Sequence, residues 1–304
     1  LFRRNTAGTW TFVRKLVEHP QDSMIPYNAH VALRQAVAAV SLERLFVFER
    51  TAAGWVESPA PSGALFGTDI EIDAGTILSS TGDCGWDASP FRKSSSGAWT
   101  AFGYIQGRPR GCDDEFQGGD VDISGNRAIV FNEADATSST PEARLYEVGA
   151  APPWQDVATL TTPPGADTRL PPLFGPYVAL RNSTALVSGS LFSGTYVFNR
   201  DSAGGWNVSS TLQVPDALGG ASYVRSLELR DGFAGQAQVS LEHGAVGTIN
   251  VFQRQSDNSF RYVAKLVASQ VTNPNSLLHS FDISGGRIAV SGNGYAYVYE
   301  LPED

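Results

Sequence analysis

The chain has 304 residues, of which 42% are hydrophobic, 11% aromatic and 17% charged, and it contains 31 Gly and 17 Pro. This composition is typical of an ordered, turn-rich globular protein and excludes a disordered chain. Its 22 basic and 31 acidic residues give a formal net charge of −9, and no cluster of Lys and Arg is present, so nucleic acid is excluded as a partner. No run of about 18 apolar residues occurs, and we expect no membrane insertion.

Tryptophan sets the register of an internal repeat. Trp10, Trp55, Trp99, Trp154 and Trp206 recur roughly every 50 residues, and Phe260 takes the next place. A short apolar strand and a turn precede most of them, which predicts a β-hairpin in each unit. Two further strands with alternating apolar residues follow a loop in each unit. Four strands per unit of this length, repeated along the chain, predict an all-β protein that forms a single β-propeller.

The repeat also carries a family resemblance. Its inner strand has an F-G pair in two copies, Phe66-Gly67 and Phe174-Gly175, and its third strand has an F-x-R pattern followed by G-x-W, as in 198–206. In these motifs nearly the whole chain resembles the FG-GAP type of propeller repeat, which occurs in integrin α-subunit heads and many bacterial surface proteins. The resemblance implies the propeller fold strongly and function weakly. The D-x-D-x-D-G calcium loops of the integrin repeats are absent, so no metal ligand is carried over from that family.

Six inner strands predict six four-stranded blades, with seven as the alternative if the sequence is a trimmed piece. The expected single domain spans 1–304, with blade repeats at about 27–58, 66–106, 116–161, 174–213, 223–267 and 277–301. The last unit lacks a Trp strand, whereas the chain opens with one. We therefore expect the N-terminal segment 9–17 to close the ring by pairing with the last blade.

The polar positions of the inner strands are candidate site residues. Side chains alternate along a strand, so residues at every second position point to the same side. These positions hold six carboxylates and one histidine: Asp69, Glu71, Asp120, Asp122, Glu228, Asp282 and His30. Because Ca²⁺ and Mg²⁺ prefer oxygen ligands, the carboxylates are candidates for a divalent cation site in the central channel. The alternative is that they are a solvated channel lining inherited through the repeat.

Catalytic motifs are absent from the sequence. It contains no G-x-S-x-G elbow, P-loop, H-E-x-x-H or C-x-x-C pattern. If the protein is an enzyme, it is a polysaccharide lyase or hydrolase acting at the channel, with His30, His279, Asp69 and Glu71 as the candidate catalytic residues. A structural role for the histidines is the alternative. A strongly perturbed pKa in a cleft would favour the enzyme, because a solvated lining would not show one.

The loops around the second blade depart from the repeat. Cys84 and Cys112 fall in loops that leave a blade on the same face, so a disulfide between them is expected, with free thiols as the alternative. Trp86 is the one tryptophan outside the periodic column, and charged residues surround it in the sequence. A rigid ring amid charges is typical of a contact surface for a protein or carbohydrate ligand, and the alternative is that Trp86 only caps its blade and the charges are solvated. The candidate ligand-binding residues are Trp86, Asp83, Asp87, Arg108, Arg110, Asp113 and Asp114.

These observations favour a non-catalytic, secreted or cell-surface propeller that binds a protein or glycan through one loop face. An extracellular or periplasmic location would suit the expected disulfide and the resemblance. Two alternatives remain open: the channel enzyme described above, and a structural domain of a larger surface protein.

Overall fold

The computed structural model contains a ring of antiparallel β-sheets and, in the part of the chain that it describes, no helix. It describes residues 1–16, 30–41, 44–59, 61, 69–80, 88–105, 119–132, 142–161, 174–189, 194–215, 222–240, 247–267, 280–292 and 295–301. No described helix is long and apolar enough to cross a membrane.

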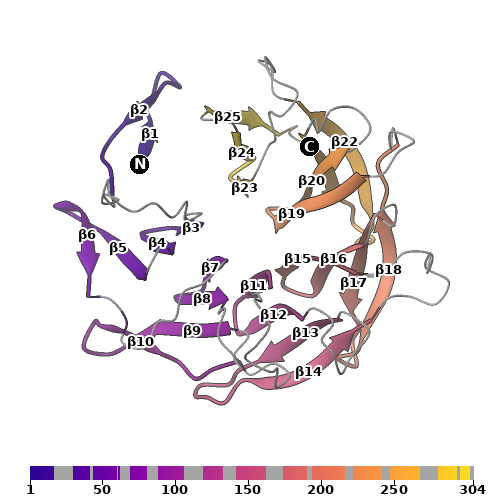
Figure 1. Ribbon diagram of the computed structural model, residues 1–304, viewed down its shortest axis with the longest axis horizontal. Coiled ribbons are helices and arrows are strands. Elements are labelled where there is room, and N and C mark those ends of the chain that lie inside the picture. The colour runs from indigo at the N-terminus through magenta and orange to yellow at the C-terminus, as the bar shows by residue number, and fades with distance from the viewer. Residues whose placement is uncertain are drawn as a thin grey trace, which may run out of the picture.

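Six blades follow one another around the ring in chain order (Figure 1). Within each blade the strands pair as an antiparallel meander, with the first strand innermost. The first three blades are β3 (His30–Arg34), β4 (Val37–Ser41), β5 (Leu45–Thr51), β6 (Gly54–Ser58); β7 (Ile70–Asp73), β8 (Thr76–Ser80), β9 (Ala88–Lys93), β10 (Trp99–Ala101); and β11 (Val121–Ser124), β12 (Arg127–Asn132), β13 (Glu142–Glu147), β14 (Gln155–Leu160). The next three are β15 (Phe174–Arg181), β16 (Thr184–Gly189), β17 (Thr195–Arg200), β18 (Trp206–Leu212); β19 (Ser222–Arg230), β20 (Phe233–Ser240), β21 (Gly247–Arg254), β22 (Phe260–Leu266); and β23 (Ser280–Ser284), β24 (Arg287–Gly292), β25 (Tyr295–Glu300).

The hydrophobic core lies between consecutive blades. On each inner strand from β7 onward, one set of alternating side chains is apolar and packs onto the preceding blade. Ile70 and Ile72 of β7, for example, share a cluster with Ala39 and Val47 of the first blade. Complete burial of such side chains contributes about 1.5–3 kcal/mol each, so the stacking of neighbouring blades stabilises the ring.

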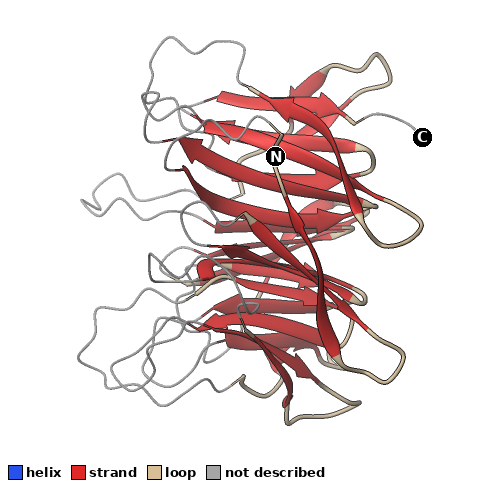
Figure 2. Cartoon of the chain, turned by 90° about the vertical axis from the view of Figure 1, so that its right-hand side faces the viewer, coloured by secondary structure: helices blue, strands red, loops and turns tan. Residues whose placement is uncertain are grey.

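The other set of alternating side chains on each inner strand points toward the following blade and the channel. The short turns after the first and third strands lie on one side of the ring (Figure 2). Inner strands therefore begin at the opposite side, where Asp69 and Asp120 are placed, and they end at the turn side, where Asp73 and Arg181 are placed.

The N-terminal strands differ from the prediction. β1 (Phe2–Arg4) and β2 (Trp10–Phe12) form a two-stranded sheet of their own, and the last blade has three strands in the described residues. The expected backbone ladder between the segment 9–17 and the last blade is thus wrong for the part of it that is described, 9–16. The reason is local: Gly8 has a φ of 83° and Asn5 Oδ1 accepts a hydrogen bond from Thr9 N at 2.9 Å, which closes a tight hairpin turn.

The hairpin nevertheless contacts the blades on both sides of it. Arg4 Nη1 lies 3.1 Å from Glu300 Oε1 of the last blade. Arg14 Nη1 donates to the Trp55 carbonyl oxygen of the first blade at 2.7 Å, and Leu16 packs against Phe48. The N-terminal segment therefore bridges the first and last blades at the outside of the ring, through side chains.

Candidate functional site in the central channel

A cavity of about 700 Å³ occupies the channel between the inner strands. All the carboxylates that the sequence singled out line it, and so does His30. The lining carboxylates are Asp69, Glu71, Asp120, Asp122, Glu228 and Asp282. The sequence analysis therefore identified the acidic residues of the channel, and the structure brings them together around one space.

Several of these carboxylates accept hydrogen bonds from backbone amides of the neighbouring blade. Asp69 Oδ2 accepts a hydrogen bond from Val121 N of the next inner strand at 2.9 Å. One blade further on, Asp120 Oδ2 accepts from Val178 N at 2.7 Å. An intramolecular hydrogen bond contributes about 0.5–1.5 kcal/mol, so these contacts help to fix the spacing of the blades.

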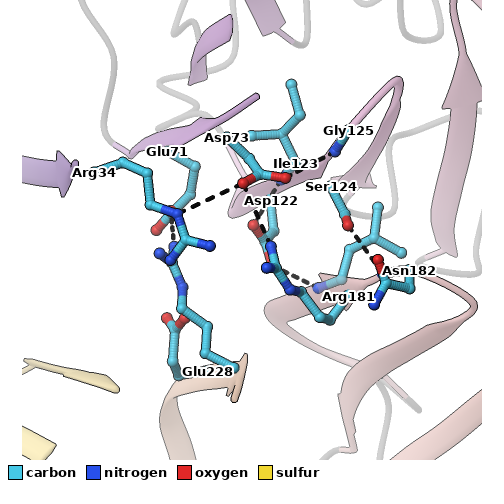
Figure 3. A network of polar contacts seen from close by, with 12 residues as sticks. Arg34, Glu71, Asp73, Asp122, Ile123, Ser124, Gly125, Arg181, Asn182 and Glu228 are labelled. Atoms are coloured by element: carbon cyan, nitrogen blue, oxygen red, sulfur yellow. Dashed lines mark hydrogen bonds and ion pairs between the residues drawn. The ribbon is translucent and has the colours of Figure 1, made fainter. Parts of the chain in front are cut away.

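Equivalent hydrogen bonds to backbone amides occur at every second residue further along the inner strands. Asp122 Oδ2 accepts from Leu180 N at 2.5 Å. Ser124 Oγ accepts from Asn182 N at 2.9 Å, as Figure 3 shows. These contacts account for part of the acidic lining without any ligand. These side chains therefore link neighbouring blades through backbone amides, and the solvated lining and the cation site both stay predictions.

Arg230 is the central residue that the sequence analysis missed. It ends β19, its side chain is only 11% exposed, and it crosses the channel so that Nη2 lies 2.7 Å from Glu71 Oε2 of β7. Its Nε pairs with Glu228 on its own strand and lies 3.9 Å from Asp282 Oδ1 of the next blade. One guanidinium thus binds carboxylates from three blades.

Arg230 could have been predicted by extending the alternation of polar positions on the inner strands by two residues. The positions at the end of the inner strands form a third polar column: Arg34, Asp73, Ser124, Arg181, Arg230 and Ser284. In this column Asp73 Oδ1 lies 3.6 Å from Arg34 Nε and 3.4 Å from Arg181 Nη1 (Figure 3). The arginines therefore lie at the end of the channel where the inner strands end in turns. Most of the carboxylates lie closer to the opposite end, where the inner strands begin.

Burial changes the protonation of the channel carboxyls. It raises the pKa of Glu228 to about 8, even though Arg230 favours the charged form. Burial likewise raises the pKa of Asp122 to about 7, against the effects of Arg230 and of the amide hydrogen bonds. The pKa of Glu71 lies well above its ordinary value because of burial and the nearby charges of Glu228 and Asp122. Near neutral pH the channel therefore holds a mixture of protonated and ionised carboxyls.

Asp69 and Asp120 form a carboxyl pair at the end where the inner strands begin. Burial and the nearby charge of Asp69 raise the pKa of Asp120 well above its ordinary value. A protonated Asp120 is therefore favoured next to the Asp69 carboxyl group.

Other predicted site residues are not brought into the channel by the described structure. His30 lies at the start of β3 and lines the cavity, whereas its proposed partner His279 lies outside the described residues. The loop residues of the predicted contact surface and the two cysteines also lie outside them: Trp86, Asp83, Asp87, Arg108, Arg110, Asp113, Asp114, Cys84 and Cys112. The ligand surface and the disulfide stay predictions.

In the described part of the chain, no group of three or more His, Cys, Asp or Glu residues is arranged to hold a metal ion. The partners of the channel carboxylates explain why they do not form such a group. Asp69, Asp120 and Asp122 direct oxygens to backbone amides, and Glu71 and Glu228 direct theirs to Arg230, which occupies the place of a cation.

No protein family and no curated protein matches the sequence. Solved structures do match it in shape. A protein from Lactobacillus plantarum is 14% identical with a TM-score of 0.60, over 98% of this chain and 86% of that one. The Pseudomonas aeruginosa periplasmic gluconolactonase PpgL is 13% identical with a TM-score of 0.65, over 98% and 86%. YCF48, solved bound to the D1 peptide, is 12% identical with a TM-score of 0.55, over 99% and 84%.

At these identities the likeness shows the fold alone. It supports the propeller and leaves the FG-GAP type a prediction. From its sheets and its structural relatives, the chain is a six-bladed β-propeller.

Proposed function

We propose that this propeller binds a protein partner and takes a positively charged side chain of that partner into the acidic end of its channel. The observation that carries the proposal is the imbalance of charge in the cavity. Six carboxyl groups line it, and Arg230 is the one arginine or lysine among its lining residues.

A second cation in the channel would be favoured for an electrostatic reason. Arg230 lies near Glu71, Glu228 and Asp282, and the Asp69 and Asp120 pair lies beyond its ion pairs. Charges attract more strongly in a site shielded from water, and a lysine or arginine from a partner would favour the ionised form of Asp120. YCF48 was solved with a peptide, which supports a protein ligand for a propeller of this shape. PpgL is described as periplasmic, and we propose an extracellular or periplasmic location for this chain as well.

Fluorescence anisotropy with a labelled hexalysine peptide tests the proposal, with hexaglutamate as the probe of opposite charge. The double variant Asp69→Asn/Asp120→Asn should weaken hexalysine binding at least tenfold. The matched control Glu57→Gln/Asp156→Asn removes the same formal charge from exposed residues of outer strands and should bind as wild type does. Equal weakening in both variants would assign the binding to net charge alone and would refute the channel site.

The Asp69 and Asp120 pair also supports a second candidate, an acid–base enzyme at the channel mouth. Its basis is the raised pKa of Asp120 beside a second carboxyl group in the cavity lining, because a protonated carboxyl can donate a proton and a neighbouring carboxylate can accept one. The test is hydrolysis of a panel of sugar lactones and glycosides. Turnover that Asp120→Asn abolishes and Glu57→Gln leaves unchanged would establish this activity, and no turnover on any substrate would exclude hydrolysis of these classes.

A further inference from the structure

Ion pairs join neighbouring blades on the turn side of the ring, near the ends of the third strands. Lys93 ends β9, and its Nζ lies 2.5 Å from Glu49 Oε2 of the preceding blade. Two blades further on, Arg200 ends β17, and its Nη2 lies 3.3 Å from Glu147 Oε1 of the preceding blade. Glu49 and Glu147 occupy the same place in their blades, because each pairs with the first residue of the second strand. A basic side chain therefore meets a carboxylate at both interfaces.

The interface between the fourth and fifth blades has the basic residue without the carboxylate. Arg254 ends β21 as Arg200 ends β17, and Asn199 takes the position of Glu147 in the fourth blade. Among the described residues Arg254 makes no ion pair, and its buried Nε has no hydrogen-bond partner. Both flanking blades have all four strands, so every strand position at this interface is filled.

Asn199 does not replace the carboxylate as an acceptor for Arg254. Its Oδ1 accepts from Thr184 Oγ1 at 2.7 Å, and its Nδ2 donates to Ser209 Oγ at 2.8 Å. Thr184 is fully buried, and its hydroxyl accepts from Arg254 Nη2 at 2.8 Å, which holds the guanidinium in place. This contact uses one of the five N–H donors of the guanidinium. The positive charge of Arg254 therefore has no counterion in the part of the chain that the structure describes.

We propose that Arg254 binds a small carboxylate ligand, which takes the place that the Glu147 side chain has beside Arg200. A carboxylate is the group that the fold itself uses here, because Glu49 and Glu147 present one at the two equivalent interfaces. A guanidinium can donate in parallel to both oxygens of a carboxylate, and such a ligand would give Nε its partner. Arg254 is half-buried, so a ligand can reach it from the turn side, and water screens the attraction less than at an exposed residue.

The test is a titration of the ¹⁵N-labelled protein with sodium acetate, in which NMR follows the Nε–Hε signals of the arginine side chains. Sodium chloride keeps the ionic strength constant, and the Arg254 signal is assigned by its loss in Arg254→Lys. We expect a saturable shift of the Arg254 signal. The Arg200 signal should not move, because Glu147 already pairs with that guanidinium.

Two variants separate the site from a change in net charge. Asn199→Glu supplies the carboxylate from the chain itself and should weaken the binding of acetate to Arg254 at least tenfold. Val208→Glu is the matched control: it adds the same charge at a residue that is 40% exposed on β18, and the variant should respond as wild type does.

A parallel titration with the blocked peptide acetyl-Gly-Glu-Gly-amide identifies the source of the ligand. Binding tighter than that of acetate assigns the site to an acidic side chain of a protein, and weaker binding assigns it to a free carboxylate.

Three outcomes would overturn the proposal: no saturable shift of the Arg254 signal, an equal shift of the Arg200 signal, and an undiminished response in a folded Asn199→Glu variant. The proposal does not rest on cation binding, because Arg254 lies on the turn side of the ring and Asp69 and Asp120 lie on the opposite side (Figure 2). The Asp69→Asn/Asp120→Asn variant should therefore keep its response to acetate even where hexalysine binding is lost.

Discussion

Glu228→Gln should make the stability of the protein less dependent on pH. Glu228 is buried beside Arg230, and burial raises its pKa from 4.5 to about 8. A carboxyl with a raised pKa in the folded state binds more protons there than in the unfolded chain, so folding stability falls as pH rises between these two values. Gln keeps the shape of the side chain and an oxygen that can accept from Arg230 Nε, but it does not titrate.

The magnitude follows from linkage. One additional proton in the folded state changes the free energy of unfolding by about 1.4 kcal/mol per pH unit, so between pH 5 and 7 the contribution of Glu228 reaches roughly 3 kcal/mol. Because the pKa of Asp122 is also raised, to about 7, the wild type loses stability on account of both groups, and the variant should lose roughly 3 kcal/mol less over this range.

Urea unfolding at pH 5, 6, 7 and 8 measures this difference, with the free energy extrapolated to zero denaturant. Glu57→Gln, at an exposed position of β6, is the control and should follow the wild type. Identical pH slopes for Glu228→Gln and the wild type would refute the reasoning, because Glu228 would then be ionised in the folded protein.

Two further substitutions test the packing around the channel. Arg230→Met leaves the carboxylates of Glu71 and Glu228 without their partner, so we expect the free energy of unfolding to fall by about 3–5 kcal/mol at pH 8. The loss should be smaller at pH 5, where the carboxyls are protonated. Urea unfolding at the two pH values measures both losses, and equal losses would contradict the expectation. Gly235→Ala places a Cβ 2.2 Å from Phe281 Cε2, so we expect overpacking to cost about 1–3 kcal/mol between the last two blades. Thermal unfolding measures the effect, and Phe281→Leu should relieve it if this contact is the cause.

The sequence was sufficient to predict the blades because each unit carries its own local signals. The Trp column and the turns mark the outer hairpins, and strict alternation marks inner strands such as Ile70–Asp73. Alternation also placed the carboxylates on one side of the inner strands, and they do line one cavity. These features depend on short-range periodicity, which a single sequence displays directly.

The partners of the site residues could not be predicted in the same way. The contact between Arg230 and Glu71 joins residues 159 positions apart, and it depends on how far around the ring the two blades lie. The backbone amides that Asp69 and Asp120 bind leave no trace in the sequence, because any residue type supplies an amide N–H. The pairing of the N-terminal strand failed for a related reason, since a local hairpin with β1 competes with a distant edge.

Burial between the blades keeps carboxyl groups of the channel protonated near neutral pH. The most direct test is a pH titration of the glutamate side-chain carboxyl ¹³C resonances of the labelled protein by NMR. We predict a resonance with a midpoint near pH 8 that is missing from the spectrum of Glu228→Gln. Titration of every glutamate of the folded protein near the ordinary value of 4.5 would contradict this and would indicate an open, solvated channel lining.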